Sequence, residues 1–261
     1  MIYIGKRNIL TFIKRLLSLR NIFSIINFFK VYKSPFRAVF REVFSFDKYP
    51  DLISIKTPTG KKKVTLYSPN DFSTLNLIFC RKDYIFKEDY KIILDIGSNI
   101  GLSTFYWLTR NKKTKVFCYE PSTSNFKKLK KNLSGFKKRV YLHKEAVSNR
   151  NYVTNLNIEK TGVYSSLNKS KKIKFTGTEK CKVVDINKCI NKIIKICGKI
   201  DMIKIDSEGE EIKTLTSIKK NYLKFIKCIN IDLSEDFNKK IFLPQFEISR
   251  VGSAIRLTNN A

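Results

Sequence analysis

Residues 92–101 read Ile-Ile-Leu-Asp-Ile-Gly-Ser-Asn-Ile-Gly. A short apolar run that ends in two glycines predicts a buried strand, a tight turn and a helix, because glycine accepts backbone conformations closed to other residues. The spacing G-x-x-x-G differs from the G-x-G-x-x-G of a dinucleotide-binding turn, which surrounds a pyrophosphate with amide donors. An acid, Asp95, stands just before the turn. Its charge disfavours a phosphate and suits a cationic ligand.

The chain around this turn alternates short apolar runs with helical stretches. The apolar runs that predict further strands are Val116–Tyr119, Val140–Leu142, Met202–Asp206 and Cys228–Leu233, and the helical stretches are 101–110, 123–133 and 210–220. Such alternation predicts an α/β fold with a doubly wound parallel sheet. Ligands of such sheets bind at the carboxyl ends of the strands. Residues 150–184 alternate without a long helix and predict an antiparallel insertion.

Two more acidic positions stand at predicted strand ends. Glu120 follows Gly101 by 19 residues, the spacing at which an acid accepts hydrogen bonds from a ribose. S-adenosylmethionine fits both observations, since it carries a sulfonium, an amino group and a ribose but no phosphate. The alternative is an ordinary strand–helix turn.

The third position is the run Lys204-Ile205-Asp206-Ser207-Glu208-Gly209-Glu210-Glu211. Acids in the first turn of a helix complement its dipole, and this explains Glu210 and Glu211. It explains Asp206 and Glu208 less well, because these two stand on the turn itself.

The composition describes one medium-sized globular domain, or one domain with an appendage. The chain has 261 residues, 43% of them hydrophobic, and 52 Lys and Arg against 22 Asp and Glu give a formal charge of +30. Two explanations of this charge stay open: a basic face for a polyanion, or heavy use of lysine at solvated positions. The six cysteines form no C-x-x-C pair and the single histidine is His143, so we expect no structural zinc site. We expect reduced thiols in a cytoplasmic protein, because the chain shows no signal peptide with a cleavage site.

Residues 1–41 contain nine basic residues and no acid. Phe12, Leu16, Leu19, Phe23 and Ile26 recur at spacings of three and four and predict an amphipathic helix. Charged residues interrupt it too often for a membrane span. It either lies in the interface of an anionic membrane or packs its apolar stripe on the domain behind it. Pro35 is expected to end the segment.

The next segments lead into the main domain. Residues 52–67 predict a hairpin around Pro58-Thr59-Gly60, and residues 71–86 predict a helix. We therefore expect a basic helical arm at 1–49 and a catalytic domain at 50–261, with the insertion at about 150–184.

Taken together, these motifs resemble the FkbM-type S-adenosylmethionine-dependent methyltransferases over residues 50–235. The resemblance rests on Leu-Asp-Ile-Gly-Ser-Asn-Ile-Gly, Tyr-Glu-Pro and Lys-Ile-Asp-Ser-Glu-Gly-Glu-Glu in this order, and extends to Asn125, Ala146-Val147-Ser148 and Ser165-Ser166. It implies the Rossmann-like class I methyltransferase fold, with seven strands of which the last is antiparallel. It also implies transfer of a methyl group to a hydroxyl.

The resemblance assigns roles to individual residues. The methionine-side loop of the cofactor site would be Asp95, Gly97, Asn99 and Gly101. Glu120 would bind the ribose, and Ala146 would lie near the adenine. Asp206, Glu208 and Lys204 would face the methyl-transfer site. Glu210 departs from the family, which has a small residue there, and Asp232 stands where a glutamate is more typical.

The chemistry needs a group that accepts the proton of a hydroxyl acceptor, and we expect Asp206 or Glu208 to do so. His143 is more often structural at such a position, and a magnesium ion held by Asp206, Glu208 and Asp232 is a lesser alternative. The expected acceptor is a saccharide or glycolipid, with the basic arm near an anionic membrane. A nucleic-acid methyltransferase and a non-catalytic basic binding protein are the competing hypotheses.

Overall fold

The computed structural model describes residues 3–4, 7–8, 19–44, 48–84, 86–162, 165–168, 173–232, 243, 245–251 and 254–260. The chain forms two compact units. Unit 1 comprises Met1–Asp83 with Thr109–Lys112, and unit 2 comprises Tyr84–Leu108 with Lys113–Ala261. The division into an arm and a catalytic domain at residue 49 stays a prediction.

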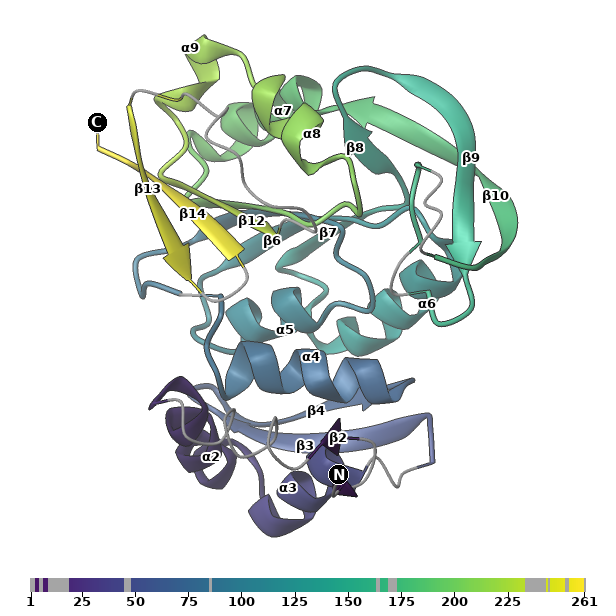
Figure 1. Ribbon diagram of the computed structural model, residues 1–261. Coiled ribbons are helices and arrows are strands. Elements are labelled where there is room, and N and C mark those ends of the chain that lie inside the picture. Colours follow the sequence, from purple (N-terminus) through teal and green to yellow (C-terminus); the bar gives the residue numbers. More distant parts are fainter. Residues whose placement is uncertain are drawn as a thin grey trace. The chain divides into compact units, whose positions relative to one another are not determined.

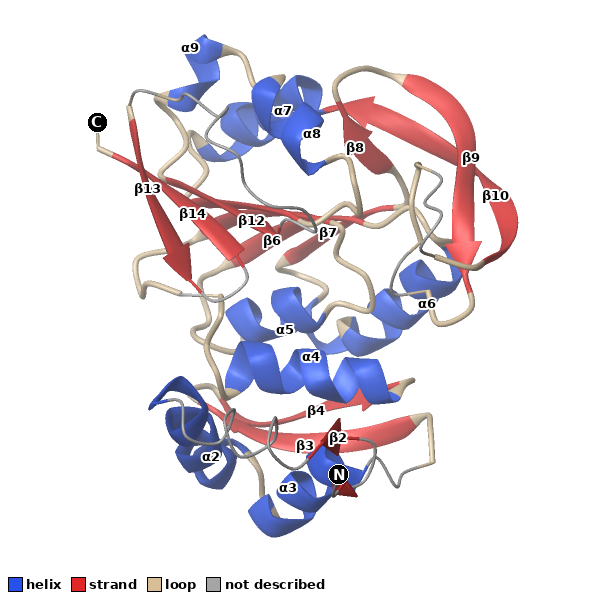
Figure 2. Cartoon of the chain, viewed as in Figure 1, coloured by secondary structure: helices blue, strands red, loops and turns tan. Residues whose placement is uncertain are grey.

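Unit 2 is built on a seven-stranded sheet in the order β13-β14-β12-β11-β5-β6-β7 (Figures 1 and 2). Its strands are β5 (Ile92–Ile96), β6 (Lys115–Tyr119), β7 (Val140–His143), β11 (Met202–Ile205), β12 (Cys228–Asp232), β13 (Phe246–Val251) and β14 (Ala254–Asn259). Neighbours from β7 to β12 pair in parallel, whereas β14 runs antiparallel to both β12 and β13. The expected sheet, with its last strand antiparallel, is confirmed.

Helices cover both faces of this sheet. One face carries α5 (Leu102–Leu108) and α6 (Thr123–Asn132), and the other carries α7 (Ile186–Cys197), α8 (Glu211–Thr216) and α9 (Lys220–Leu223) (Figure 1). The expected helix over 210–220 is too long, because it breaks at Ser217 into α8 and α9. The expectations did not include α7, although Asp185 caps its first turn and Gly198 ends it at φ +78°. A single turn, η1 (Ser134–Phe136), follows α6.

The insertion forms a separate three-stranded sheet in the order β8-β10-β9. Its strands are β8 (Ala146–Ser148), β9 (Tyr152–Glu159) and β10 (Phe175–Asp185). The pairing of β9 with β10 is antiparallel, which confirms the expected antiparallel insertion. A small apolar cluster that includes Leu156 and Val183 fixes this sheet.

Unit 1 holds the predicted hairpin, β3 (Asp51–Thr57) and β4 (Gly60–Leu66), with helices α2 (Leu19–Val31), α3 (Pro35–Phe44) and α4 (Pro69–Phe79). A two-residue pair, β1 (Tyr3–Ile4) with β2 (Arg7–Asn8), lies near the N-terminus. The helix expected over 71–86 ends at Phe79. Pro35 separates α2 from α3 as expected, because the first turn of a helix accepts proline.

The amphipathic helix of the arm packs with a different face from the expected stripe. Phe12 and Leu16 lie outside the described residues, and the side chain of Leu19 is not described. Phe23 and Ile26 are 64% and 45% exposed. The side chains that pack are Phe28, Val31 and Tyr32, all at most 8% exposed.

Contacts with α4 explain this choice of face. The Tyr32 ring packs against Phe72 and its hydroxyl donates to Asn76 Oδ1, while Asn27 Nδ2 donates to the carbonyl of Cys80.

No described helix is long and apolar enough to cross a membrane.

Candidate functional site

The loop after β5 is fixed around the buried carboxylate of Asp95. Its Oδ2 accepts hydrogen bonds from Ser103 Oγ at 2.9 Å and from Thr104 Oγ1 at 2.6 Å. The side chain of Ser98 donates to the Asp95 carbonyl at 3.0 Å. Two partners come from the first turns of α5, so the acid ties the strand end to the helix that follows. The acid that the sequence singled out is therefore held rigidly beneath the turn.

Gly97 is the point where the loops after β5 and β11 meet. Its φ is +76°, and a Cβ at this position would lie 1.8 Å from the carbonyl oxygen of Asp206. Gly101, at φ +90°, closes against α6, where a Cβ would lie 2.7 Å from Leu129 Cδ1. No other residue type fits at Gly97 without a backbone shift, because the obstructing atom belongs to the main chain.

Lys204 links the same two loops from below. Its Nζ donates to the Gly97 carbonyl at 2.9 Å and lies 3.3 Å from Asp95 Oδ1 and 3.1 Å from Asp206 Oδ2. Its side chain is 3% exposed. Burial opposes the charge of this ammonium group, but Asp206 and Asp95 outweigh burial and hold the Lys204 pKa well above its usual value. The structure thus brings together four of the predicted site residues: Asp95, Gly97, Lys204 and Asp206.

Glu120 lies at the end of β6 and is 5% exposed. Its Oε2 accepts from the backbone N–H of Asn99 at 2.8 Å, and its Oε1 accepts from that of Ser122 at 2.9 Å. Burial raises the pKa of Glu120 to about 7, although both backbone hydrogen bonds oppose the shift. Asn99 and Glu120 are therefore in direct contact, while Ala146 begins β8 in the separate sheet.

The turn from Asp206 to Glu211 presents its acids in different ways. Glu208 has φ +49°, an unusual conformation for a residue with a side chain. Burial, followed by the nearby charge of Asp206, raises the Glu208 pKa to about 8. The Glu211 carboxylate accepts from the backbone N–H groups of Ser207 and Gly209, so it holds the turn that precedes α8.

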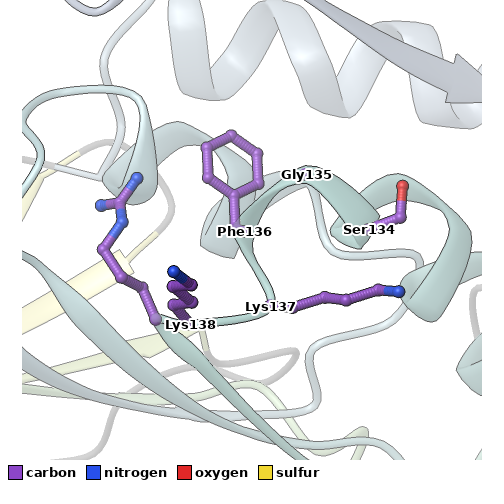
Figure 3. A pocket seen from close by; sticks show the side chains of 6 residues that line it. Ser134, Gly135, Phe136, Lys137 and Lys138 are labelled. Atoms are coloured by element: carbon purple, nitrogen blue, oxygen red, sulfur yellow. The ribbon is translucent and has the colours of Figure 1, made fainter.

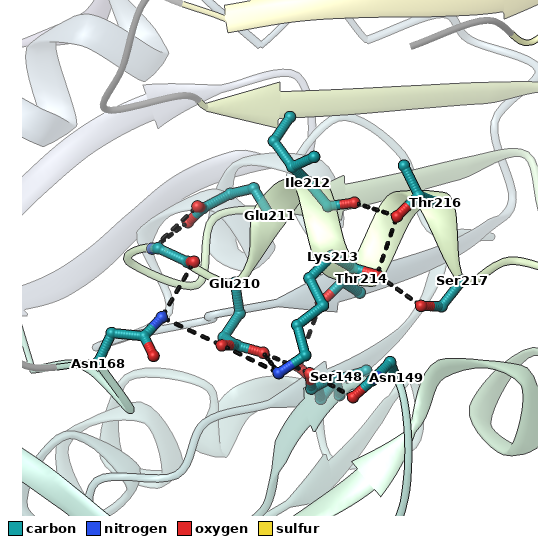
Figure 4. Close-up of polar contacts among 12 residues, drawn as sticks. Ser148, Asn149, Asn168, Glu210, Glu211, Ile212, Lys213, Thr214, Thr216 and Ser217 are labelled. Carbon is teal, nitrogen blue, oxygen red and sulfur yellow. Dashed lines mark hydrogen bonds and ion pairs between the residues drawn. The ribbon is translucent and has the colours of Figure 1, made fainter. Parts of the chain in front are cut away.

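Glu210 points away from this turn into a polar network with the insertion (Figure 4). Its carboxylate accepts from Ser148 Oγ at the end of β8 and from Asn168 Nδ2 at 3.1 Å, and it lies 3.0 Å from Lys213 Nζ. Asn168 also donates to the Gly209 carbonyl at 3.1 Å. Burial raises the pKa of Glu210, but the contacts with Ser148, Lys213 and Asn168 outweigh it and lower the pKa overall. Glu210, which stands where the family has a small residue, thus has a structural role here, because it connects this turn to Ser148 and Asn168.

The structure adds Tyr84, which the sequence did not point to, and gives a contact to Ser166, to which the resemblance extended. Tyr84 is 8% exposed, and its ring lies 6.0 Å from Lys204 Nζ. Burial raises the Tyr84 pKa well above its usual value. Ser166 Oγ donates to the carbonyl of Glu208 and so holds the turn from the insertion. Tyr84 lies between α4 and β5, outside every motif, so no local pattern could have found it.

Two further candidates, His143 and Asp232, end other strands of the same sheet. His143 ends β7 and stacks on Tyr119 with ring centroids 4.5 Å apart, in keeping with a packing role. Asp232 ends β12, and its charge helps to raise the Glu208 pKa. Among the described residues, no three His, Cys, Asp or Glu side chains converge as a metal-binding group. A hollow lined by Ser134–Arg139 lies just before β7, at the amino edge of the sheet and opposite the carboxylates (Figure 3).

Comparison with known families decides the assignment. The model of the methyltransferase FkbM domain matches residues 95–250. The chain belongs to the FkbM methyltransferase family. It is thus an S-adenosylmethionine-dependent methyltransferase with the Rossmann-like class I fold that the motifs implied. This removes the non-catalytic alternative.

Solved methyltransferase structures are similar to this chain at low identity. A Staphylococcus aureus protein assigned as a caffeoyl-CoA O-methyltransferase is 15% identical over 72% of this chain and 83% of its own, with a TM-score of 0.41. TrmK of M. capricolum, solved with S-adenosyl-homocysteine, is 12% identical over 72% of this chain and 68% of its own, with a TM-score of 0.39. No curated protein sequence matches this chain.

The residues at the carboxyl edge of the sheet fit the cofactor of this methyltransferase. Three carboxylates, those of Asp95, Glu120 and Asp206, stand at the ends of β5, β6 and β11. S-adenosylmethionine offers such groups a sulfonium, an ammonium and two ribose hydroxyls. It brings no phosphate that the carboxylates would repel.

Proposed function

We propose that this methyltransferase transfers a methyl group to a hydroxyl of a saccharide or glycolipid. The observation that carries the proposal is the pair Asp206 and Glu208 on one turn at the carboxyl edge, with the Glu208 pKa raised to about 8. A sugar hydroxyl is a weak nucleophile and needs a base within hydrogen-bond reach. A carboxyl group with a pKa near the working pH is suited to that task.

On the cofactor side, we assign the methionine-side loop to Asp95, Gly97, Asn99 and Gly101. Asp95 is too deeply buried to leave its partners Ser103 and Thr104, so it shapes this loop from beneath. Glu120 accepts the ribose hydroxyls through the lone pairs that its two backbone donors leave over. Ala146 borders the adenine.

On the acceptor side, we assign the base to Glu208. Asp206 is held in an ion pair with Lys204 at 3.1 Å, so we assign the proton acceptor to the other carboxylate of the turn. The Lys204 ammonium is already engaged by three oxygens, so Lys204 and Asp206 position the turn. The bound cofactor supplies the activated methyl group. The Glu208 carboxylate receives the hydroxyl proton as the acceptor oxygen forms its bond to carbon.

The test of this function is transfer of labelled methyl from S-adenosylmethionine to a panel of saccharides and glycolipids, with RNA and DNA as a second panel. The second panel is included because the formal charge of +30 also suits binding to a nucleic acid. We expect product on the first panel alone. Product on RNA or DNA alone would overturn the acceptor class.

The base assignment has its own test in variants. Glu208→Gln is expected to lower kcat by about 10²–10⁴-fold while S-adenosylhomocysteine affinity stays close to that of the parent. In the parent, kcat rises with pH up to about 8, because only the ionised form of Glu208 accepts a proton. Asp206→Asn should keep a rise of kcat with pH but move it to lower pH, because the Asp206 charge contributes to the raised Glu208 pKa. Loss of the profile in Asp206→Asn but not in Glu208→Gln would move the role to Asp206.

We also propose a cytoplasmic location, because all six cysteines are free thiols. Residues 1–41 would contact an anionic membrane there, where a glycolipid acceptor lies.

A further inference from the structure

Helices α2 and α3 expose large apolar side chains on one continuous surface. Phe23, Ile26 and Phe29 recur every three residues on α2, and they are 64%, 45% and 46% exposed. Phe36 and Phe40 lie one turn apart on α3 and are 76% and 53% exposed. The Phe29 and Phe36 rings meet edge to face with centroids 5.4 Å apart, which joins the two helices. We call these five side chains the α2–α3 surface.

The described charged side chains around the α2–α3 surface are basic. Lys30, Lys33 and Arg37 are exposed between and beside its apolar side chains, and no acid precedes Glu42 in the chain. Soluble proteins seldom expose this many large apolar side chains together without a binding partner. A basic rim around an apolar patch matches a partner with an apolar interior and an anionic surface.

The described acids of unit 1 contact other groups of that unit. Between residues 48 and 83 the acids are Asp51, Asp71 and Asp83. Asp51 pairs with Arg41 at 2.6 Å, and Asp83 pairs with Arg81. Asp71 accepts from the backbone N–H of Tyr67 at 2.7 Å. These three carboxylates thus have partners outside the α2–α3 surface.

We propose that the α2–α3 surface docks this methyltransferase on an anionic lipid bilayer. Phe23, Ile26, Phe29, Phe36 and Phe40 enter the boundary between headgroups and acyl chains, and Lys30, Lys33 and Arg37 meet the lipid phosphates. This proposal rests on the membrane contact of the proposed function and names the side chains that make it. It does not depend on which hydroxyl the enzyme methylates.

Two other occupants fit the observations less well. A second copy would bring two acid-free, basic surfaces against each other, at a cost in repulsion. A single-stranded nucleic acid uses aromatic rings as stacking platforms. Here Phe29 and Phe36 pack edge to face, at an interplanar angle of 89°, and Ile26 offers no ring.

The experiment is sedimentation of the full chain with phosphatidylcholine vesicles that contain or lack phosphatidylglycerol. We expect binding to the anionic vesicles alone, weakened by salt. Phe23→Ser with Phe36→Ser should lower the partition coefficient by on the order of a hundredfold, about tenfold for each ring. Leu52→Ser is the matched control, because Leu52 is 56% exposed on β3 of the same unit, and it should leave binding unchanged.

The charge contribution has a matched pair of variants as well. Lys30→Glu with Lys33→Glu should abolish binding to anionic vesicles. Lys61→Glu with Lys63→Glu makes the same change of charge on β4, and it should weaken binding far less. An unchanged urea unfolding transition establishes that each variant is folded.

Three results would overturn the proposal. One is absent binding, or equal binding to both kinds of vesicle. Another is a concentration-dependent dimer that Phe23→Ser with Phe36→Ser dissolves. The third is RNA binding that this variant loses while vesicle binding stays. None of them affects methyl transfer to a soluble saccharide, so failure of the docking surface and failure of the acceptor class are distinguishable.

Discussion

The carboxyl edge of the large sheet and the α2–α3 surface carry opposite charges within one chain. At the edge, Asp95, Glu120 and Asp206 are each held by backbone or buried partners, with Lys204 among them. On the α2–α3 surface the apolar side chains are exposed and the rim is basic. Rigid positioning suits a site that must orient two reactants, whereas an exposed apolar patch suits a fluid partner. Substitutions should therefore have very different costs in the two regions.

The largest effect is expected at Gly97. Gly97→Ala places a methyl group 1.8 Å from the Asp206 carbonyl oxygen, so the loops after β5 and β11 must separate. We expect a loss of more than about 4 kcal/mol in the free energy of unfolding, or failure to fold. Gly198→Ala is the control, since Gly198 has nearly the same φ, +78°, with no atom within 4 Å of its Cβ position. It should cost about 1–2 kcal/mol in urea unfolding. Equal losses in the two variants would mean that the close contact has no consequence.

The next largest effect is expected at Lys204. Lys204→Met leaves the fully buried Asp95 without its counter-ion, and we expect a loss of about 4 kcal/mol in the free energy of unfolding. Adding Asp95→Asn should restore part of it, because the uncompensated charge is then gone. Lys227→Met removes an exposed pair with Asp89 and should cost less than about 1 kcal/mol. A Lys204→Met protein as stable as Lys227→Met would contradict the buried ion-pair network.

Within the arm, substitutions of Phe28 and Phe36 should distinguish the packed face from the α2–α3 surface. Phe28 is 5% exposed and its ring packs at a tilt against that of Tyr32, so Phe28→Ala should destabilise unit 1 by about 3 kcal/mol. Phe36 is 76% exposed, and Phe36→Ala should change the free energy of unfolding by less than about 0.5 kcal/mol. Chemical denaturation of the two variants makes the comparison. A comparable loss in Phe36→Ala would mean that Phe36 is part of the fold.

The same contrast explains what the sequence could predict. The turns after β5 and β11 could be predicted from the sequence, because glycine spacing and acids at strand ends are local patterns. Parallel strands then bring their carboxyl ends together at one edge of the sheet. Glu210 was recognised as a departure, but its partners Ser148 and Asn168 are distant in the chain. Tyr84 reaches the site only through folding of the chain, so no motif contains it.

It was harder to predict from the sequence which face of helix α2 packs against the rest of unit 1. The period of α2 predicted an amphipathic helix, yet Phe28, Val31 and Tyr32 pack while Phe23 and Ile26 stay exposed. Both sets of residues are apolar, and the decision depends on Phe72 and Asn76 of α4, which no spacing within α2 reveals. Contacts with α4 thus decide which face of α2 packs, and the periodicity of α2 alone does not decide it.

The smallest effect, and the one that tests the two regions together, is a pH dependence at Glu120. Its pKa of about 7 means that the carboxylate is mostly ionised at pH 8 and mostly protonated at pH 6. A protonated acid is the poorer acceptor for ribose hydroxyls, so S-adenosylhomocysteine affinity should fall about tenfold as pH falls through 7. Glu120→Gln should bind more weakly at pH 8 and show no such fall.

Vesicle binding by the α2–α3 surface should stay constant over this range, because lysine and arginine side chains ordinarily remain charged there. Calorimetry and sedimentation on the same samples measure both. A pH-independent affinity in the parent would exclude the titration of Glu120 from cofactor binding, and a parallel fall in vesicle binding would mean that the two regions do not act separately.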